Sequence, residues 1–308
     1  MKSGIINVYK EAGYTSFDVV AKLRGILHIK KIGHTGTLDP DATGVLPVCI
    51  GKATKVCDLL TNKDKTYTAT LLMGKSTDTY DISGTVTNEI EVNVTEKEVR
   101  KVIDSFIGEI EQVPPMYSAI KVNGKKLYEL AREGKVIERK PRKVTIYNIE
   151  VIDISLPRVT MIIDCSKGTY IRSLCNDIGE KLGCCGCMES LIRNKVGDFS
   201  IDDAIIIEEI QSACNENKIE ELIYPIDYVF SSYPKGVIKE ESEKYALNGG
   251  KLRMFNLVDS EINCELGGNN PKNYSKFIRL YLQNGKFVGL YRKEQEDLIL
   301  EKMFYEDI

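Results

Sequence analysis

The spacing of apolar residues predicts several helices, each with a start or stop signal. Ser16 is a good N-cap, and the residues after it place one apolar face toward a core, formed by Phe17, Val20, Leu23 and Leu27. Thr95 and Glu98 form a capping box ahead of a second apolar face, formed by Val99, Val102, Ile103 and Phe106. Further helices are predicted over KLYELARE, which ends before Gly134, and over residues 171–182, which end at Gly183.

Alternation of apolar and polar residues predicts strands between these helices. The period of two begins after Lys65 with TYTATLLMG, and strand-like runs recur over residues 144–154 and 159–165. Asn123-Gly124 is a hairpin-grade turn. After about residue 232 the texture changes to short strands joined by turns, namely KFIRLYLQ, FVGLYRK and DLILEKMF. We therefore predict a large domain in residues 1–232 and a small β-rich domain in residues 233–308.

The composition is that of an ordinary globular protein, but the charge is uneven. The net charge is −3, yet residues 1–143 carry 23 Lys and Arg against 18 Asp and Glu, so the N-terminal part is positive. This asymmetry is compatible with a partner that presents phosphates. No apolar run approaches the roughly 18 residues of a membrane span, and the nine cysteines are an odd number without a secretory signal. We expect a cytoplasmic protein with reduced thiols and no membrane contact.

Several familiar catalytic arrangements are excluded by the residues available. With only His28 and His34, a multi-histidine metal site is impossible. The GKAT sequence at 51–54 lacks the spacing and the Ser or Thr of a phosphate-binding loop. The cysteines at 184, 185 and 187 are one C-x-x-C without a second pair, which favours structural thiols over a metal site. None of these three kinds of site is therefore expected.

Carboxylate chemistry remains, with Asp39 as the candidate. Asp39 precedes Pro40, which restricts it to an extended or turn conformation. An aspartate can act as a nucleophile if a cation orients it, and Arg172 is the candidate cation. Two interpretations stay open on these residues alone, because Asp39 could equally open an Asx-turn and Arg172 could be a surface residue. Tyr67 and Tyr170 are similarly ambiguous between packing and stacking on nucleobases.

Five segments together resemble the TruB family of pseudouridine synthases, which isomerise a uridine in the T-loop of tRNA. They occur in the family's order over most of residues 5–200: VYKEAGYTSFDVV, GHTGTLDPDATGVLPVCIGKATK, DKTYTATLLMGKSTDTYDISGTV, QVPPMYSAIKVNGKKLYELAREG and CSKGTYIRSLCNDIGEKLG. Two positions depart from the family pattern. Glu11 stands where proline is usual, and Ile192 replaces the first arginine of the family's L-R-R.

The resemblance implies a fold and a role for each matched residue. The fold would be α+β, with a mixed, mainly antiparallel sheet flanked by helices and a small PUA-like C-terminal domain. Asp39 would be the catalytic aspartate, Arg172 its partner, and Tyr67 a residue that stacks on the uracil or transfers a proton. The substrate-binding residues would be His34, Tyr170, Leu191, Lys10 and Lys55, with His34 beside the flipped nucleotide and the two lysines on phosphates.

The resemblance also implies a partner and an activity. The partner would be the T-arm of tRNA, and the enzyme would convert the uridine at position 55 in tRNA numbering, without a cofactor or metal. A monomer is the expected state. Two alternatives are a tRNA-binding or tRNA-folding chaperone module and an RNA-guided pseudouridine synthase that works in a ribonucleoprotein.

Overall fold

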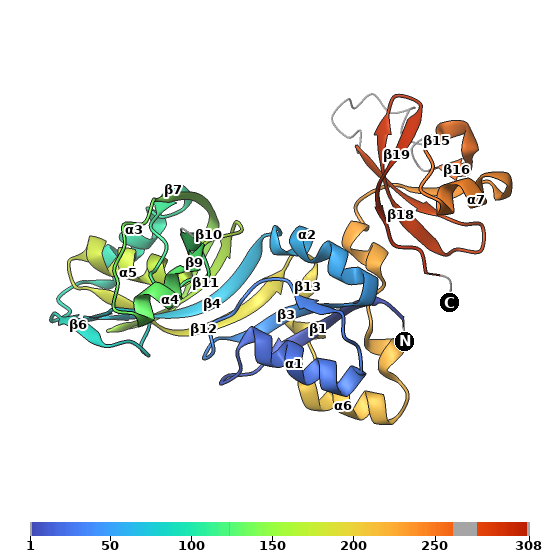
Figure 1. Cartoon of the computed structure of the whole chain (residues 1–308). Coiled ribbons are helices and arrows are strands. Elements are labelled where there is room, and N and C mark those ends of the chain that lie inside the picture. Colours follow the sequence, from blue (N-terminus) through green and yellow to red (C-terminus); the bar gives the residue numbers. More distant parts are fainter. Residues whose placement is uncertain (1, 123, 261–275, 307–308) are drawn as a thin grey trace.

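A nine-stranded sheet is the core of the larger part of the molecule (Figure 1). The computed structural model describes residues 2–122, 124–260 and 276–306. The main path of the sheet runs β1-β3-β12-β4-β11-β10-β7, with β2 attached to β3 and β13 attached to β12. Its strands are β1 (Gly4–Lys10), β2 (Ile32–His34), β3 (Thr43–Ile50), β4 (Lys65–Met73), β7 (Gly108–Gln112), β10 (Arg142–Ser155), β11 (Arg158–Cys165), β12 (Gly186–Val196) and β13 (Phe199–Ser200). All pairings within it are antiparallel except β3–β12.

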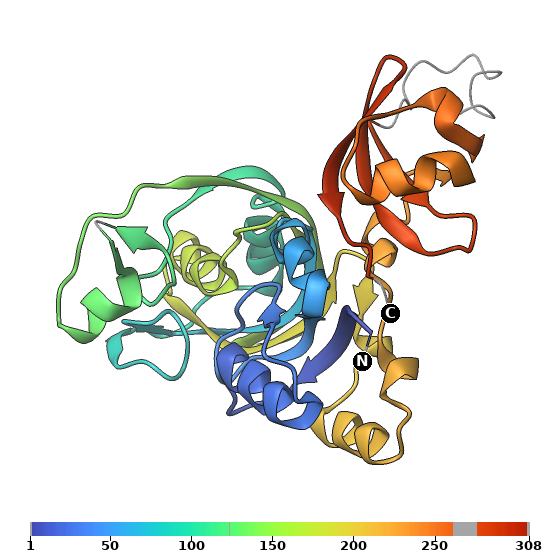
Figure 2. The same ribbon diagram turned by 45° about the vertical axis from the view of Figure 1, so that its right-hand side comes forward.

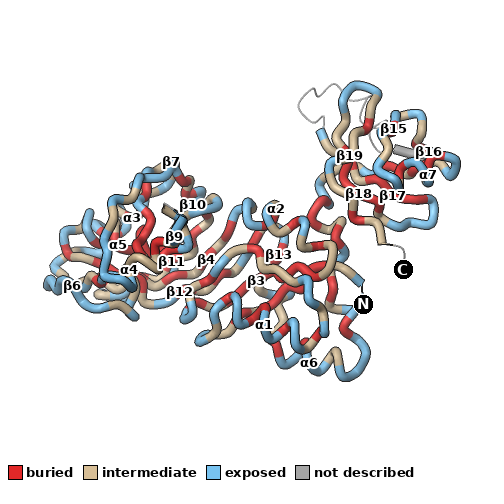
Figure 3. Tube along the Cα trace, in the orientation of Figure 1, coloured by how far each residue is buried: buried red, intermediate tan, exposed pale blue. Residues whose placement is uncertain are grey.

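Helices cover this sheet in two groups (Figures 1 and 2). The helices α3 (Glu96–Asp104) and α5 (Ile171–Leu182) pack on β4, β10 and β11, whereas α1 (Ser16–Leu27) and α6 (Ile207–Asn215) pack on β1 and β3. Figure 3 shows buried residues along the length of the sheet between these groups. The smaller elements of this part are α2 (Cys57–Thr61), α4 (Leu127–Arg132) and the short pairs β5 (Lys75–Thr77) with β6 (Val86–Glu89) and β8 (Lys121–Val122) with β9 (Lys125–Lys126).

The first helix begins differently from the prediction. Thr15, not Ser16, is the N-cap, and it forms a capping box with Asp18. Ser16 is turned inward, where its Oγ accepts a hydrogen bond from the backbone N–H of Leu38 at 2.9 Å. Phe17 was predicted on the apolar face but is 65% exposed. The buried face follows the spacing Ser16, Val19, Val20, Leu23 and Leu27, and position 17 lies outside that stripe.

The other local predictions are mostly confirmed. The capping box of Thr95 and Glu98 starts α3, and α5 ends at Gly183 in the left-handed conformation. The predicted hairpin turn joins β8 to β9, although Asn123 lies outside the described residues. The strands β2 and β3 were not predicted, because their stretch of sequence is interrupted by glycines and by Pro47. Pro47 is nevertheless inside β3, and its carbonyl accepts from the N–H of Thr35 at 3.2 Å.

A second, six-stranded sheet follows, in the order β15-β19-β18-β17-β14-β16. Its elements are β14 (Lys235–Ile238), α7 (Glu240–Leu247), β15 (Leu252–Arg253), β16 (Leu257–Ser260), β17 (Phe277–Tyr281), β18 (Phe287–Glu294) and β19 (Asp297–Met303). The three C-terminal strands predicted from sequence are β17, β18 and β19. The exact domain boundary at residue 232 stays a prediction.

Aromatic side chains join the two sheets. Phe230 lies 5.7 Å, between ring centroids, from Phe304, and Phe304 stacks on Phe287 at 5.6 Å. These rings share one hydrophobic cluster with Ile5 and Val45 of the large sheet. The ammonium group of Lys55 donates a hydrogen bond of 2.9 Å to the carbonyl of Met303 in β19. Two further hydrogen bonds join the same parts of the chain, from Lys302 to the carbonyl of Lys55 and from Ser3 to Glu306. The small sheet is therefore anchored on the large one by a common core.

Gly44 permits the closest approach between β3 and β12, and this gives a stability prediction. Its φ is +103°, and a Cβ there would lie 2.3 Å from the carbonyl oxygen of Arg193. We expect Gly44→Ala to lower the free energy of unfolding by about 1–2 kcal/mol for the left-handed backbone and a further ~1–3 kcal/mol for the overlap. Gly13→Ala is the matched control, because Gly13 has φ +85° and nothing within 4 Å. Urea unfolding of both variants checks this, and equal losses would contradict it.

Candidate active site

Asp39 lies in the turn between β2 and β3, where Arg172 binds both of its carboxylate oxygens. The Nε of Arg172 is 3.0 Å from Oδ2, and its Nη2 donates to Oδ1 at 3.0 Å. The side chain of Asp39 is still 35% exposed. A two-pronged guanidinium–carboxylate pair fixes the plane of the carboxylate as well as its position. One face of Asp39 is thus held and solvent still reaches the group.

Arg172 is buried and joins several segments that are distant in sequence. It is the second residue of α5, and its side chain is 7% exposed. It also donates hydrogen bonds to the carbonyls of Thr79 at 3.2 Å and Tyr117 at 2.8 Å. A second carboxylate, Asp81, lies 3.6 Å away, between Asp81 Oδ2 and Arg172 Nη1. The predicted pair of Asp39 and Arg172 is therefore brought together, and Asp81 is a partner that the sequence analysis missed.

Opposing effects act on the Asp39 carboxyl. Removal from water raises its pKa above the ordinary 3.8, and this is the largest influence. The positive charge of Arg172 lowers the pKa, and the negative charge of Asp81 raises it. The balance leaves the pKa raised. A carboxylate in this setting is weakly solvated and positioned, which are the properties that an aspartate nucleophile requires.

Lys10 is buried under the turn that carries Asp39 and binds its main chain. Its side chain is fully buried, and its Nζ donates to three backbone carbonyls, those of Tyr14 at 2.6 Å, Pro40 at 2.9 Å and Glu11 at 3.0 Å. Burial lowers the pKa of Lys10 to about 8. The phosphate contact predicted for Lys10 is therefore wrong for this structure, because the ammonium group is enclosed by the main chain.

Arg193 is a second buried cation beneath the same turn. It is 1% exposed, and its guanidinium donates to the carbonyls of Val45 at 2.7 Å, Gly36 at 3.2 Å and Thr37 at 3.5 Å. Within the part of the chain that the structure describes, no carboxylate forms an ion pair with it. Burial lowers its pKa. Arg193 was given no role in the sequence analysis, because nothing in its local pattern indicated burial.

Tyr67 and Leu191 form the apolar side of the site. Tyr67 on β4 is paired across the sheet with Arg193 on β12. Tyr67 is 9% exposed and Leu191 is 8% exposed, and both share a core cluster with Leu38, the residue before Asp39. Burial raises the pKa of the Tyr67 phenol, whereas the positive charge of Arg193 acts to lower that pKa. Tyr67 thus presents only a small part of its ring to solvent.

Tyr170 immediately precedes α5 and is half-buried. Its N–H donates to Gln112 Oε1 at 2.7 Å, and its carbonyl accepts from Gln112 Nε2 at 3.0 Å. These two bonds fix the chain just before Arg172. Burial raises the pKa of the Tyr170 phenol.

His34 lies at the end of β2, on the other side of the turn. Its Nδ1 accepts from the N–H of Gly36 at 3.4 Å, and burial lowers its pKa below the ordinary value. His28, by contrast, is the left-handed C-cap of α1. Lys55 lies at the joint with the small sheet through its bond to Met303, so its predicted phosphate contact stays a prediction.

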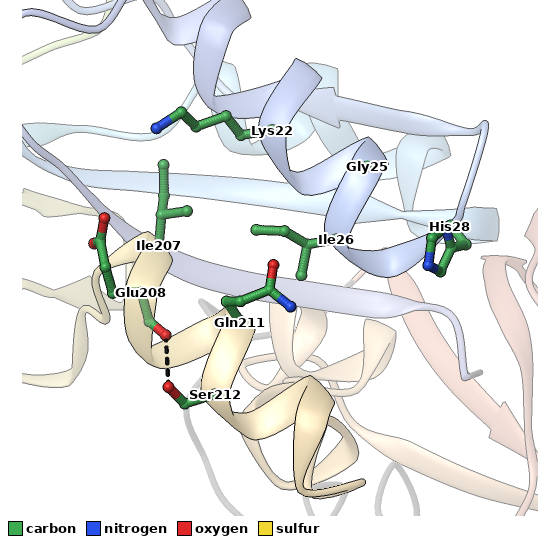
Figure 4. A pocket seen from close by; sticks show the side chains of 8 residues that line it. All are labelled: Lys22, Gly25, Ile26, His28, Ile207, Glu208, Gln211 and Ser212. Atoms are coloured by element: carbon green, nitrogen blue, oxygen red, sulfur yellow. Dashed lines mark hydrogen bonds between the residues drawn. The ribbon is translucent and has the colours of Figure 1, made fainter.

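A hollow lies elsewhere on the described surface. It has a volume of about 740 Å³ and lies between α1 and α6 (Figure 4), lined by Lys22, Gly25, Ile26, His28, Ile207, Glu208, Gln211 and Ser212. None of these residues belongs to the cluster around Asp39. Among the described residues there is no group of three or more His, Cys, Asp or Glu side chains suited to a metal ion, and no helix long and apolar enough to cross a membrane.

Comparisons with known proteins agree with this geometry. Residues 24–171 match the N-terminal domain of TruB family pseudouridylate synthases, and residues 172–231 match the C-terminal domain of tRNA pseudouridylate synthase B. The chain is 51% identical over 302 residues to tRNA pseudouridine synthase B of Lachnoclostridium phytofermentans, covering 96% of both chains. It is 46% identical over 301 residues to the protein of that name from Clostridium kluyveri, covering 98% of this chain and 99% of that protein.

Solved structures extend the likeness to the whole chain. A chain in a Cbf5-Nop10-Gar1 complex is 27% identical with a TM-score of 0.73, and one in an H/ACA RNP bound to a substrate RNA containing 2'-deoxyuridine is 25% identical with a TM-score of 0.72. Each likeness covers 98% of this chain and 85% of the other. The predicted fold class, including the PUA-like C-terminal part, is confirmed. The matched domains and the close relatives show that the chain belongs to the TruB family of pseudouridine synthases.

Proposed function

We propose that this protein converts the T-loop uridine of tRNA, position 55 in tRNA numbering, to pseudouridine with Asp39 as the nucleophile. The observation that carries the proposal is the Asp39 carboxylate, held through both oxygens by the buried Arg172 and still 35% exposed. The names of the relatives that are 44–51% identical supply tRNA as the substrate class. The oligomeric state and the cytoplasmic location remain predictions.

The reaction requires a group with the properties of Asp39. The N1–C1′ bond of uridine breaks, the uracil turns, and C5 bonds to C1′ while the proton on C5 leaves. The uracil must first be flipped out of the RNA loop, at a cost of a few kcal/mol. Asp39 then attacks either C1′, with uracil as the leaving group, or C6 of the ring. The carboxylate is released when C5 displaces it from C1′ in the first route, or by elimination from C6 after C5 has bonded to C1′ in the second. In both routes C5 loses a proton and N1 gains one. Both routes need an ionised carboxylate that is fixed close to the nucleotide, and Arg172 supports both conditions.

The two alternative functions are less well supported. An RNA-guided synthase would be expected to resemble the ribonucleoprotein chains more than the stand-alone enzymes, yet identity is 25–27% to the former and 44–51% to the latter. A pure binding module or chaperone has no use for an exposed carboxylate whose pKa is raised and whose plane is fixed. Chaperone activity alongside catalysis is compatible with the proposal.

Replacing Asp39 tests the nucleophile. Asp39→Asn should lower kcat by at least about 10³-fold and leave tRNA binding within a few-fold, because the amide cannot attack but keeps the shape. Asp41→Asn is the matched control, since Asp41 is an exposed aspartate two residues away. The measurement is pseudouridine mapping on an unmodified tRNA transcript, with filter binding in parallel. Full activity of Asp39→Asn would remove Asp39 from the role, and tight binding without modification by the wild type would favour the binding module.

The pH profile tests the charge balance at Asp39. The carboxylate is the active form, so kcat/KM should fall as the pH drops through the pKa of Asp39. Because that pKa is raised, the acid limb should lie above the ordinary 3.8. Asp81→Asn removes a negative charge that raises the pKa, so the limb should move to lower pH. An acid limb that Asp81→Asn leaves in place would contradict this electrostatic coupling.

Tyr67 tests the apolar side of the site. Tyr67→Ala should lower kcat by more than about 10²-fold with a much smaller loss in binding, because the ring positions the uracil during the reaction. Tyr67→Phe keeps the ring and removes the hydroxyl, so it separates positioning from proton transfer. Equal losses in kcat and binding for Tyr67→Ala would count against a role in the transition state.

A further inference from the structure

Phe17 is a large apolar side chain left in solvent beside the active-site loop. It is 65% exposed, although Ser16, Val19 and Val20 in the same two turns of α1 are buried. Its ring meets the imidazole of His34 edge to face, with centroids 5.1 Å apart and planes at 89°. An edge-to-face pair is a favoured aromatic geometry, and here it leaves a ring available to a further aromatic partner. The fold does not require this exposure, because other residues of α1 supply its buried face.

The chain around Phe17 is rigidly connected to Asp39. The preceding residue, Ser16, exchanges hydrogen bonds with Leu38, accepting from its N–H at 2.9 Å and donating to its carbonyl at 3.4 Å. Leu38 is adjacent to Asp39. The capping box of Thr15 and Asp18 fixes the first turn of α1. Phe17 is therefore held at a defined position relative to the carboxylate, as a substrate-positioning group must be.

The face of α1 that carries Phe17 is suited to RNA. Arg24 is seven residues further, so it lies on the same side of the helix, and both it and the intervening Ala21 are exposed. Lys30 and Lys31 follow the helix. A single exposed ring on a helix face that also carries Arg24 fits a nucleobase and a phosphate, whereas a protein partner would require a wider apolar patch. Asp18, the acid in this turn, accepts hydrogen bonds from Thr15.

We propose that Phe17, supported by His34, forms a stacking subsite for a nucleobase next to the uridine bound at Asp39. The subsite rests on the proposed function, since it assumes an RNA substrate at Asp39. Phe17 takes the base on its exposed surface, and His34 holds the ring by its edge. The subsite binds substrate and takes no part in the bond changes, so its loss weakens binding more than turnover.

Kinetics on a tRNA T-arm hairpin separate stacking from a structural role. Phe17→Ala should raise the KM or Kd by about 5- to 150-fold and change kcat by less than about 3-fold, and Phe17→Tyr should restore binding. The matched control is Phe255→Ala, because Phe255 is also 65% exposed but lies in the small-sheet part of the chain. Urea unfolding should show no loss of stability for Phe17→Ala. A loss of binding no larger than that of Phe255→Ala would overturn the subsite.

Fluorescence gives an independent readout, because the chain contains no tryptophan. Phe17→Trp introduces a single reporter, which a stacked base should quench when the hairpin is titrated in. Phe255→Trp should show a much smaller change. Unchanged fluorescence of Phe17→Trp on saturating RNA would overturn the proposal.

The two proposals fail in distinguishable ways. If the wild type forms pseudouridine normally and Phe17→Ala does not weaken RNA binding, only the stacking subsite is overturned. If the T-arm hairpin quenches the fluorescence of Phe17→Trp but the wild type forms no pseudouridine in it, base stacking at Phe17 is supported and the proposed reaction is overturned.

Discussion

Burial of positive charge beneath one turn is the constraint on which the site depends. Lys10, Arg172 and Arg193 are each no more than 7% exposed. A cation removed from water needs hydrogen-bond acceptors from the protein. Lys10 and Arg193 obtain theirs from main-chain carbonyls of the turn and its surroundings, and Arg172 obtains its from carbonyls and from Asp39. The turn must therefore keep a shape that directs its oxygens inward.

This arrangement divides two tasks between different cations. Lys10 and Arg193 stabilise the backbone, while Arg172 acts on the carboxylate itself. Asp81 shares Arg172 with Asp39, so the positive charge of Arg172 only partly balances the negative charge of Asp39, the proposed nucleophile. A carboxylate fully paired with a buried arginine would be strongly stabilised as an anion and correspondingly unreactive. The raised pKa of Asp39 fits a carboxylate that is oriented by Arg172 and keeps its reactivity.

Local sequence signals account for much of the fold and little of the site. The helices α3 and α5 and the strands β4, β10 and β11 follow from caps, stops and alternation, because each signal lies within the element itself. The strand β3 escaped notice because Gly44 and Pro47 interrupt its apolar run, although the sheet tolerates both. Residue pattern cannot show that Asp39 meets Arg172, since 133 residues separate them, and only the family resemblance joined them.

Errors at single residues have the same physical origin. The family resemblance placed Lys10 on a phosphate, and the usual exposure of lysine gave no reason to expect burial. A buried lysine whose partners are carbonyls leaves no trace in the types of its neighbours, because every residue has a carbonyl. Asp81 and Arg193 were missed for a related reason. Their roles come from sheet register and from loops that meet only in the folded chain.

Because the turn is anchored through its main chain, its backbone shape does not depend on the side chains that it exposes. Lys10 and Arg193 contact carbonyls of Gly36, Thr37 and Pro40, and no side chain of these residues takes part in those bonds. Exposed side chains such as that of Thr37 can be exchanged while the hydrogen bonds that hold Asp39 persist. Substitutions at these exposed positions can therefore adapt the surface of the turn to a different RNA loop, while the position of Asp39 and the chemistry proposed for it are retained.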